Sequence, residues 1–271
     1  MARRETAASR RAAKQTRWAW VKIGAVVAVI AVLGVVYYAI SSSNRRLDET
    51  TLCPTHPDSN TVLLVDVTDP MTVAQRQDFF NELQRLKNSI PRYGRLTVIK
   101  VDSASEHLLS PVIERCNPGA ASDVSELSGN PKAVEEQRTR FNQSLDQAFE
   151  SLTRASGADA SPILESVQSA ALTVLQAPGN EGQPRRLIIV SDLLQNTAGA
   201  NFYQRLPDPS AFIESPAFRR ARTDLRGVDV ELWMLERPDT AQTQPSALRD
   251  LWTRIIEAQG GSIVRQYRVS G

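Results

Sequence analysis

The chain has 271 residues, of which 41% are hydrophobic and 23% are charged, so one or two domains with a substantial core are expected. Its formal net charge of +2 comes from the first 22 residues, which carry seven basic residues against the single acid Glu5. Residues 23–271 hold 25 basic and 29 acidic residues, without a basic stripe that includes aromatic side chains. This composition argues against a nucleic-acid-binding protein.

An uncharged segment of 18 residues, from Ile23 to Ile40, follows the basic tail. About 20 apolar residues span a bilayer as a helix, and tryptophan and tyrosine favour the two membrane interfaces. Such aromatic residues flank or close the segment: Trp18, Trp20, Tyr37 and Tyr38. We therefore predict a single transmembrane anchor over residues 23–40.

The basic flank predicts the orientation of this anchor, because lysine and arginine stay on the cytoplasmic side of a membrane. Residues 1–22 are then a cytoplasmic tail, and the C-terminal part is exported. The compact tail and short anchor favour a bacterial inner membrane and a periplasmic domain. The alternative is a cleaved signal peptide with Ala39-Ile40-Ser41 as its cleavage site, although the apolar core of a signal peptide is shorter, about 7–15 residues.

Both cysteines, Cys53 and Cys116, lie in the exported part. An even number of cysteines in an oxidising compartment favours a disulfide. The alternative is two unpaired, buried thiols. A bridge that closes a loop of this length is expected to stabilise the fold by about 4 kcal/mol in the chain-entropy model.

The exported part begins with a polar, proline-containing stretch, residues 41–60, which we interpret as a short stalk. Strand and helix patterns alternate over the domain that follows, residues 61–271. Strands are expected at residues 61–67, 95–101, 108–116, 186–191, 228–235 and 262–269. Helices are expected from the Thr72 cap to Ile90, over 133–155, from the Ser161-Pro162 cap onward, and over 246–259.

This alternation predicts a doubly wound, mostly parallel, Rossmann-like α/β sheet. A short polar link between the second and third strands predicts a hairpin, and Pro111 places the third strand at an edge of the sheet. The longest irregular stretches are the loops 117–132 and 193–227.

Two aspartates follow two of the buried strands. Asp66 follows Thr61-Val62-Leu63-Leu64-Val65, and Asp192 follows Leu187-Ile188-Ile189-Val190-Ser191. Open α/β sheets bind their ligands at the carboxyl ends of the strands. The sequence therefore predicts that Asp66 and Asp192 share a site.

Three segments around these aspartates resemble a von Willebrand factor A (VWA) domain and occur in that family's order; the resemblance covers about residues 60–270. Asp66-Val67-Thr68-Asp69-Pro70 resembles the first metal-site segment, Asp-x-Ser/Thr-x-Ser. Ser161-Pro162-Ile163-Leu164 resembles the start of the helix before the fourth strand. Ser191-Asp192 resembles the aspartate that ends this strand.

The resemblance implies a metal-ion-dependent adhesion site in which four residues surround one Mg²⁺ or Mn²⁺ ion: Asp66, Thr68, Ser161 and Asp192. Oxygen ligands of this kind suit a hard cation, and an acidic side chain of a partner would complete the coordination. The third ligand of the first segment falls at Pro70, which has no side-chain oxygen, so the expected site is degenerate. Either Asp69, as an auxiliary ligand, or Thr72 takes that place, or the metal site is weakened or lost. The alternative is that both strand-end aspartates cap turns and hold the loops.

The resemblance further implies a membrane-tethered module for interaction or assembly with a protein partner, without catalysis of its own. In the family's topology Cys53 and Cys116 would lie at the edge remote from the site, where a bridge would fix the stalk to the domain. The alternative within the binding class is a metal-free scaffold that uses loops 117–132 and 193–227, because long loops are often functional.

The enzyme alternative is a phosphate-processing hydrolase that uses Asp66 and Asp192. The strand that ends at Asp66 also resembles haloacid-dehalogenase-type phosphotransferases, but these need a second aspartate where this chain has Thr68. The sequence contains no Gly-x-Ser-x-Gly elbow and no glycine-rich phosphate loop. Its two histidines, His56 and His107, are expected at the surface, so we predict a protein that is not an enzyme.

Overall fold

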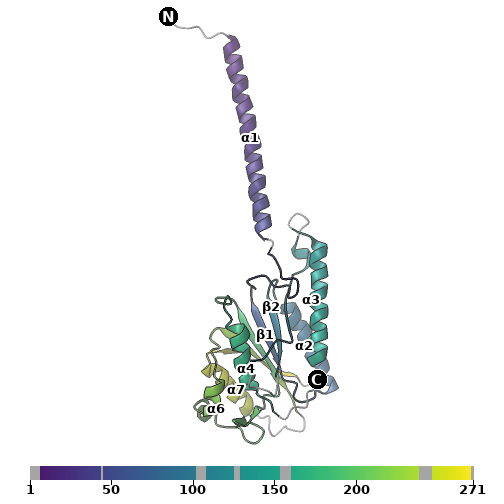
Figure 1. Ribbon diagram of the computed structural model, residues 1–271, viewed down its shortest axis with the longest axis vertical. Coiled ribbons are helices and arrows are strands. Elements are labelled where there is room, and N and C mark those ends of the chain that lie inside the picture. Colours follow the sequence, from purple (N-terminus) through teal and green to yellow (C-terminus); the bar gives the residue numbers. More distant parts are fainter. Residues whose placement is uncertain are drawn as a thin grey trace. The chain divides into compact units, whose positions relative to one another are not determined.

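The computed structural model describes residues 7–43, 45–101, 108–124, 129–152, 160–237 and 246–269. It contains two compact units, Met1–Arg45 with Val124–Asn130, and Arg46–Asp123 with Pro131–Gly271. The first unit contains helix α1 (Ala7–Ser43), and the second contains a sheet with its helices (Figure 1). His107 and the predicted end of the helix over 133–155 lie outside the described residues.

Helix α1 has the length and composition of a membrane-spanning helix. Its stretch Trp20–Tyr38 has 19 residues, a mean hydropathy of 2.3 and no buried part. Large apolar side chains are exposed along the whole stretch, as at Ile30 and Leu33. No polar face interrupts them, so by length and composition this stretch is a candidate membrane span.

A six-stranded sheet in the order β3-β2-β1-β4-β7-β8 forms the centre of the second unit. Its strands are β1 (Asn60–Val65), β2 (Arg95–Lys100), β3 (Ile113–Cys116), β4 (Arg185–Ser191), β7 (Val228–Leu235) and β8 (Ser262–Val269). Neighbouring strands are parallel except β2 and β3, which are antiparallel. The predicted fold class, a mostly parallel α/β sheet with one antiparallel edge strand, is confirmed.

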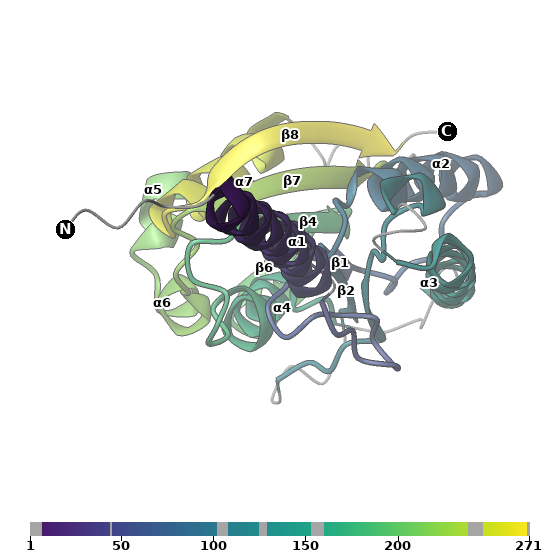
Figure 2. The same ribbon diagram turned by 90° about the horizontal axis from the view of Figure 1, so that it is seen from above.

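Helices cover both faces of this sheet (Figures 1 and 2). One side carries α2 (Val73–Ser89) and α3 (Pro131–Leu152), and the other carries α4 (Ile163–Ala170), α6 (Pro216–Ala221) and α7 (Ser246–Ala258).

Strand β1 shows why these helices lie on opposite faces. Its side chains alternate between the two hydrophobic clusters of the unit. Val62 and Leu64 pack with α4 and α7, whereas Leu63 and Val65 pack with α2 and α3. A strand that is buried on both faces therefore has a continuous apolar sequence.

Two elements differ from the sequence prediction. Strand β3 begins at Ile113 rather than at residue 108, and Pro111, which has no N–H to donate to a ladder, precedes it. The link 193–227 is not wholly irregular. It contains the short strands β5 (Asn196–Thr197) and β6 (Ala200–Asn201), and the helices α5 (Pro209–Ile213) and α6.

The segment before β1 belongs to the same compact unit as the sheet, because this unit begins at Arg46. Most of residues 41–60, which the sequence predicted to be a stalk, are therefore part of the domain. Cys53 and Cys116 form a disulfide, and Leu52, the residue before Cys53, is buried. Cys116 pairs with Arg95, the first residue of β2. The disulfide therefore lies at the edge of the sheet where the parallel strands begin.

Replacing both cysteines with serine is expected to lower the free energy of unfolding. The bridge joins residues 63 positions apart, and closing such a loop stabilises by about 4 kcal/mol through the entropy of the unfolded chain. Urea unfolding of the full chain in detergent measures the change. A reductant should destabilise the native chain and leave the double variant unchanged; a native chain indifferent to reductant would contradict this prediction.

Candidate functional site

The carboxyl ends of β1 and β4 bring Asp66 and Asp192 together. The two strands pair in parallel, with Val65 opposite Val190, and the backbone N–H of Asp66 donates to the carbonyl of Val190 at 2.8 Å. Both carboxylates are buried, at 3% and 2% exposure. The chain winds in opposite directions from β1 and from β4, so this is the topological switch point, where open α/β sheets form their ligand sites.

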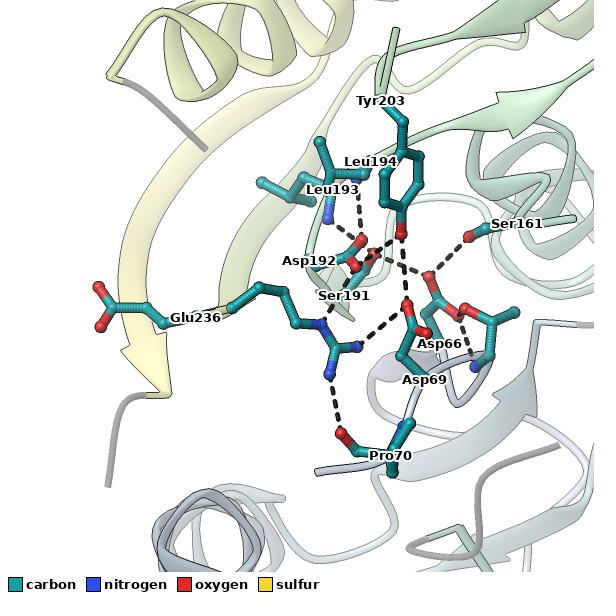
Figure 3. Close-up of polar contacts among 12 residues, drawn as sticks. Asp66, Asp69, Pro70, Ser161, Ser191, Asp192, Leu193, Leu194, Tyr203 and Glu236 are labelled. Carbon is teal, nitrogen blue, oxygen red and sulfur yellow. Dashed lines mark hydrogen bonds and ion pairs between the residues drawn. The ribbon is translucent and has the colours of Figure 1, made fainter. Parts of the chain in front are cut away.

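The carboxylate of Asp66 accepts four hydrogen bonds. Its Oδ1 accepts from the backbone N of Thr68 at 3.0 Å and from Thr68 Oγ1 at 2.7 Å. Its Oδ2 accepts from Ser161 Oγ at 2.7 Å and from Ser191 Oγ at 3.0 Å (Figure 3). The structure thus joins three sequence segments through one carboxylate.

The hydroxyl of Ser161 donates to this carboxylate. The prediction that Ser161 caps the following helix is wrong. Helix α4 begins at Ile163, and its N-cap position is Pro162, which makes no side-chain capping bond. The backbone of Ser161 is fixed instead by two hydrogen bonds of 2.9 Å to Asn196. This bridge aims the hydroxyl at Asp66 rather than along the helix axis.

Hydrogen bonds also reach Asp192 from the chain after β4, after β6 and after β7. Its Oδ1 accepts from the backbone N of Leu194 at 2.9 Å, and its Oδ2 accepts from Tyr203 Oη at 3.1 Å and from Arg237 Nε at 3.3 Å. Leu193 has a positive φ of 65°, which is costly for a branched residue and turns the chain sharply after β4. Fully buried leucine packing and the bond from Ser191 Oγ to Leu193 N, 2.9 Å long, hold this turn.

The guanidinium of Arg237 closes the site. Besides its bond to Asp192, Arg237 Nη1 donates to the carbonyl of Pro70 at 2.8 Å, and Nη2 lies 3.6 Å from Asp69 Oδ2. Tyr203 Oη also lies 3.3 Å from Asp69 Oδ2, so its single hydrogen is shared between Asp192 and Asp69 (Figure 3). Only 14% of the Arg237 side chain is exposed.

Five residues predicted from the sequence lie together at this end of the sheet: Asp66, Thr68, Ser161, Asp192 and Asp69. The sequence predicted no role for Ser191, Tyr203 or Arg237. The position of Arg237 follows from strand order. Arg237 follows β7 by two residues, and β7 is the strand next to β4, where Ser191 pairs with Met234. This pairing brings the residues after β7 beside Asp192. Nothing local in the loop sequence distinguishes Tyr203.

Burial and the nearby charge of Asp66 raise the pKa of Asp192 to about 6, although the amide of Leu194 and the guanidinium of Arg237 act in the opposite direction. Burial and the charges of Asp192 and Asp69 also raise the pKa of Tyr203, so its hydroxyl remains a donor. The site therefore combines a buried carboxylate, Asp192, whose ionisation is costly, with groups that donate to it.

These residues, as arranged, do not fit a divalent cation. The hydroxyls of Thr68 and Ser161 lie against Asp66 as the resemblance implies, but Asp192 and Asp69 face the guanidinium of Arg237. An ion between these carboxylates would lie beside a fixed positive charge. In the part of the chain that the structure describes, no three His, Cys, Asp or Glu side chains are grouped to hold a metal ion.

The fold and this edge together define a doubly wound α/β domain with a buried carboxylate pair at its switch point. No protein-family model matches the chain, and no curated protein does.

Among the solved structures that are similar, two match 79% of this chain, each at 11% identity. One is the conserved hypothetical protein BatB from Bacteroides thetaiotaomicron, matched over 91% of its length with a TM-score of 0.41. The other is an aerotolerance-related membrane protein from Bacteroides fragilis NCTC 9343 with multiple mutations to serines, matched over 92% with a TM-score of 0.40. At these scores the fold assignment rests on strand order and register, not on the matches.

The raised pKa of Asp192 predicts how stability depends on pH. Between about pH 4 and 6 the folded chain holds this proton more tightly than the unfolded chain, so the contribution of Asp192 to the free energy of unfolding falls as pH rises, by up to about 3 kcal/mol. Asp192→Asn removes this term. The stability of the variant relative to the native chain should therefore rise from pH 4 to 6 and level off above it.

Urea unfolding of both chains at several pH values measures this difference. Asp229→Asn, which changes an exposed carboxylate at the start of β7, is the control and should show no comparable rise. A constant difference between Asp192→Asn and the native chain across this range would contradict the prediction.

Proposed function

We propose that the chain is a membrane-tethered, VWA-like module that binds a protein partner through the edge of the sheet that carries Asp66 and Asp192. The observation that carries this proposal is the complete hydrogen bonding of Asp66. Three hydroxyls and one amide occupy its two oxygens. The carboxylate of Asp66 therefore has a structural role, holding the surrounding loops, and not a catalytic one.

This structural role argues against the hydrolase alternative. A nucleophilic or basic carboxylate needs an oxygen within reach of substrate, whereas Asp66 is 3% exposed and Asp192 is 2% exposed. Asp192 has its two oxygens directed to Leu194, Tyr203 and Arg237. Binding by the loops that these carboxylates hold is the simpler function.

The membrane part of the proposal has two supports. Trp20–Tyr38 is long and apolar enough to cross a membrane, and the basic residues before it favour a cytoplasmic N-terminus. The disulfide favours an oxidising compartment for the domain. We propose an uncleaved anchor over residues 23–40 in a bacterial inner membrane, with the domain in the periplasm.

The partner surface is expected around α2's first turn and the loop that holds Tyr203. Asp69 is 46% exposed and Val73 is 76% exposed, so charged and apolar groups lie next to one another on this edge. Of the two loops of the scaffold alternative, 193–227 contains Tyr203 and shares this surface, whereas 117–132 begins away from it. Asn117 bonds to Ile90 and Tyr93 near the start of β2, at the opposite edge from Asp192.

A photo-crosslinking residue at position 73 tests the proposal in membranes that contain the full chain. Position 264 is the matched control, because Val264 is also an exposed valine, at 56%, but lies on the edge strand β8. We expect a discrete adduct with a partner protein from position 73 and none from position 264. Adducts from position 264 alone would contradict the proposed surface, and turnover of a phosphomonoester that is lost in Asp66→Asn would support the hydrolase.

A further inference from the structure

We infer that the guanidinium of Arg237 takes the place of a divalent cation at this edge, so that the site is closed to metal while Arg237 is present and becomes a metal site without it. The inference concerns the site alone and stands whether or not the proposed partner surface is correct.

The two buried carboxylates at the site need a positive charge nearby. Asp66 and Asp192 are almost fully buried and lie next to each other at adjacent strand ends. The hydroxyl bonds of Asp66 satisfy its oxygens but bring no positive charge. Buried carboxylates that remain ionised require a nearby positive charge, and Arg237 supplies one at 3.3 Å from Asp192.

The contacts of Arg237 match what an ion would do here. Its three nitrogens face three oxygens from three different groups: Asp192 Oδ2, Asp69 Oδ2 and the carbonyl of Pro70. A planar guanidinium can direct several N–H groups at once and is only weakly hydrated, so it suits a nearly buried position. Because it is part of the chain, it cannot be removed by a chelator.

The same contacts account for the proline in the first segment. The family's segment has a ligand side chain where this chain has Pro70, and the carbonyl of that residue accepts from Arg237 Nη1 at 2.8 Å. An oxygen from position 70 therefore still faces the cation, although it is a backbone oxygen and the cation is a guanidinium. Pro70 and Arg237 therefore belong to one arrangement.

Mn²⁺ binding to the full chain in detergent tests the inference, with electron paramagnetic resonance of the free ion as the readout. The native chain should bind no Mn²⁺ at this site at millimolar concentration, and its melting temperature should be the same with Mn²⁺ or with a chelator. Arg237→Ala should melt at a lower temperature, gain one Mn²⁺ site, and recover part of its stability when Mn²⁺ is added.

Two further variants separate the causes. Arg237→Lys keeps a cation and should gain no Mn²⁺ site, and Arg237→Ala combined with Asp192→Asn should lose the gained site. A native chain that binds Mn²⁺ and loses it in Asp66→Asn would overturn the inference, even if Arg237→Ala does not fold. A folded Arg237→Ala or Arg237→Gln that gains no Mn²⁺ site would also overturn it.

Discussion

The burial of two carboxylates side by side at the junction of β1 and β4 is the constraint on which this domain depends. Asp66 and Asp192 follow adjacent parallel strands, so the charge of Asp66 adds to the cost of ionising Asp192. Different partners stabilise the two buried carboxylates. Three hydroxyls and an amide donate hydrogen bonds to Asp66, whereas a guanidinium and a phenol contact Asp192.

The hydrogen bonds to these two carboxylates also hold the loops at the carboxyl ends of β1 and β4 in place. The groups that satisfy the two carboxylates come from the loop after β1, from Ser161 ahead of α4, from the end of β4 and the turn after it, from the loop after β6 and from the residues after β7. Each segment is fixed because it carries a donor for a buried acid. An exposed surface built from segments held in this way is rigid, and rigid surfaces bind with a smaller entropy cost.

The fold could be predicted from the sequence because local patterns carry it. Strands β7 and β8 begin and end where their patterns predict, and the continuous apolar sequence of β1 follows from burial on both faces. The start of β3 was wrong by five residues. A pattern of apolar residues continues through Pro111, and only the pairing with β2 shows where the ladder starts.

The site could be predicted only in part. The aspartates lie at strand ends that any parallel sheet would bring together, and the resemblance added Thr68 and Ser161. The ion pair between Asp192 and Arg237 joins residues 45 positions apart, and its presence depends on which strand lies next to β4. Strand order is a tertiary property, so periodicity along the chain does not contain it.

The pairing of Arg237 with Asp192 is the central claim, and a double-mutant cycle measures it most directly. Arg237→Gln, Asp192→Asn and the double variant are compared with the native chain by urea unfolding at pH 7.5. We predict a favourable coupling free energy of about 2 kcal/mol, because the pair is nearly buried and contact pairs of this kind couple by about 0.5–3 kcal/mol. A coupling free energy of zero within error would contradict the account.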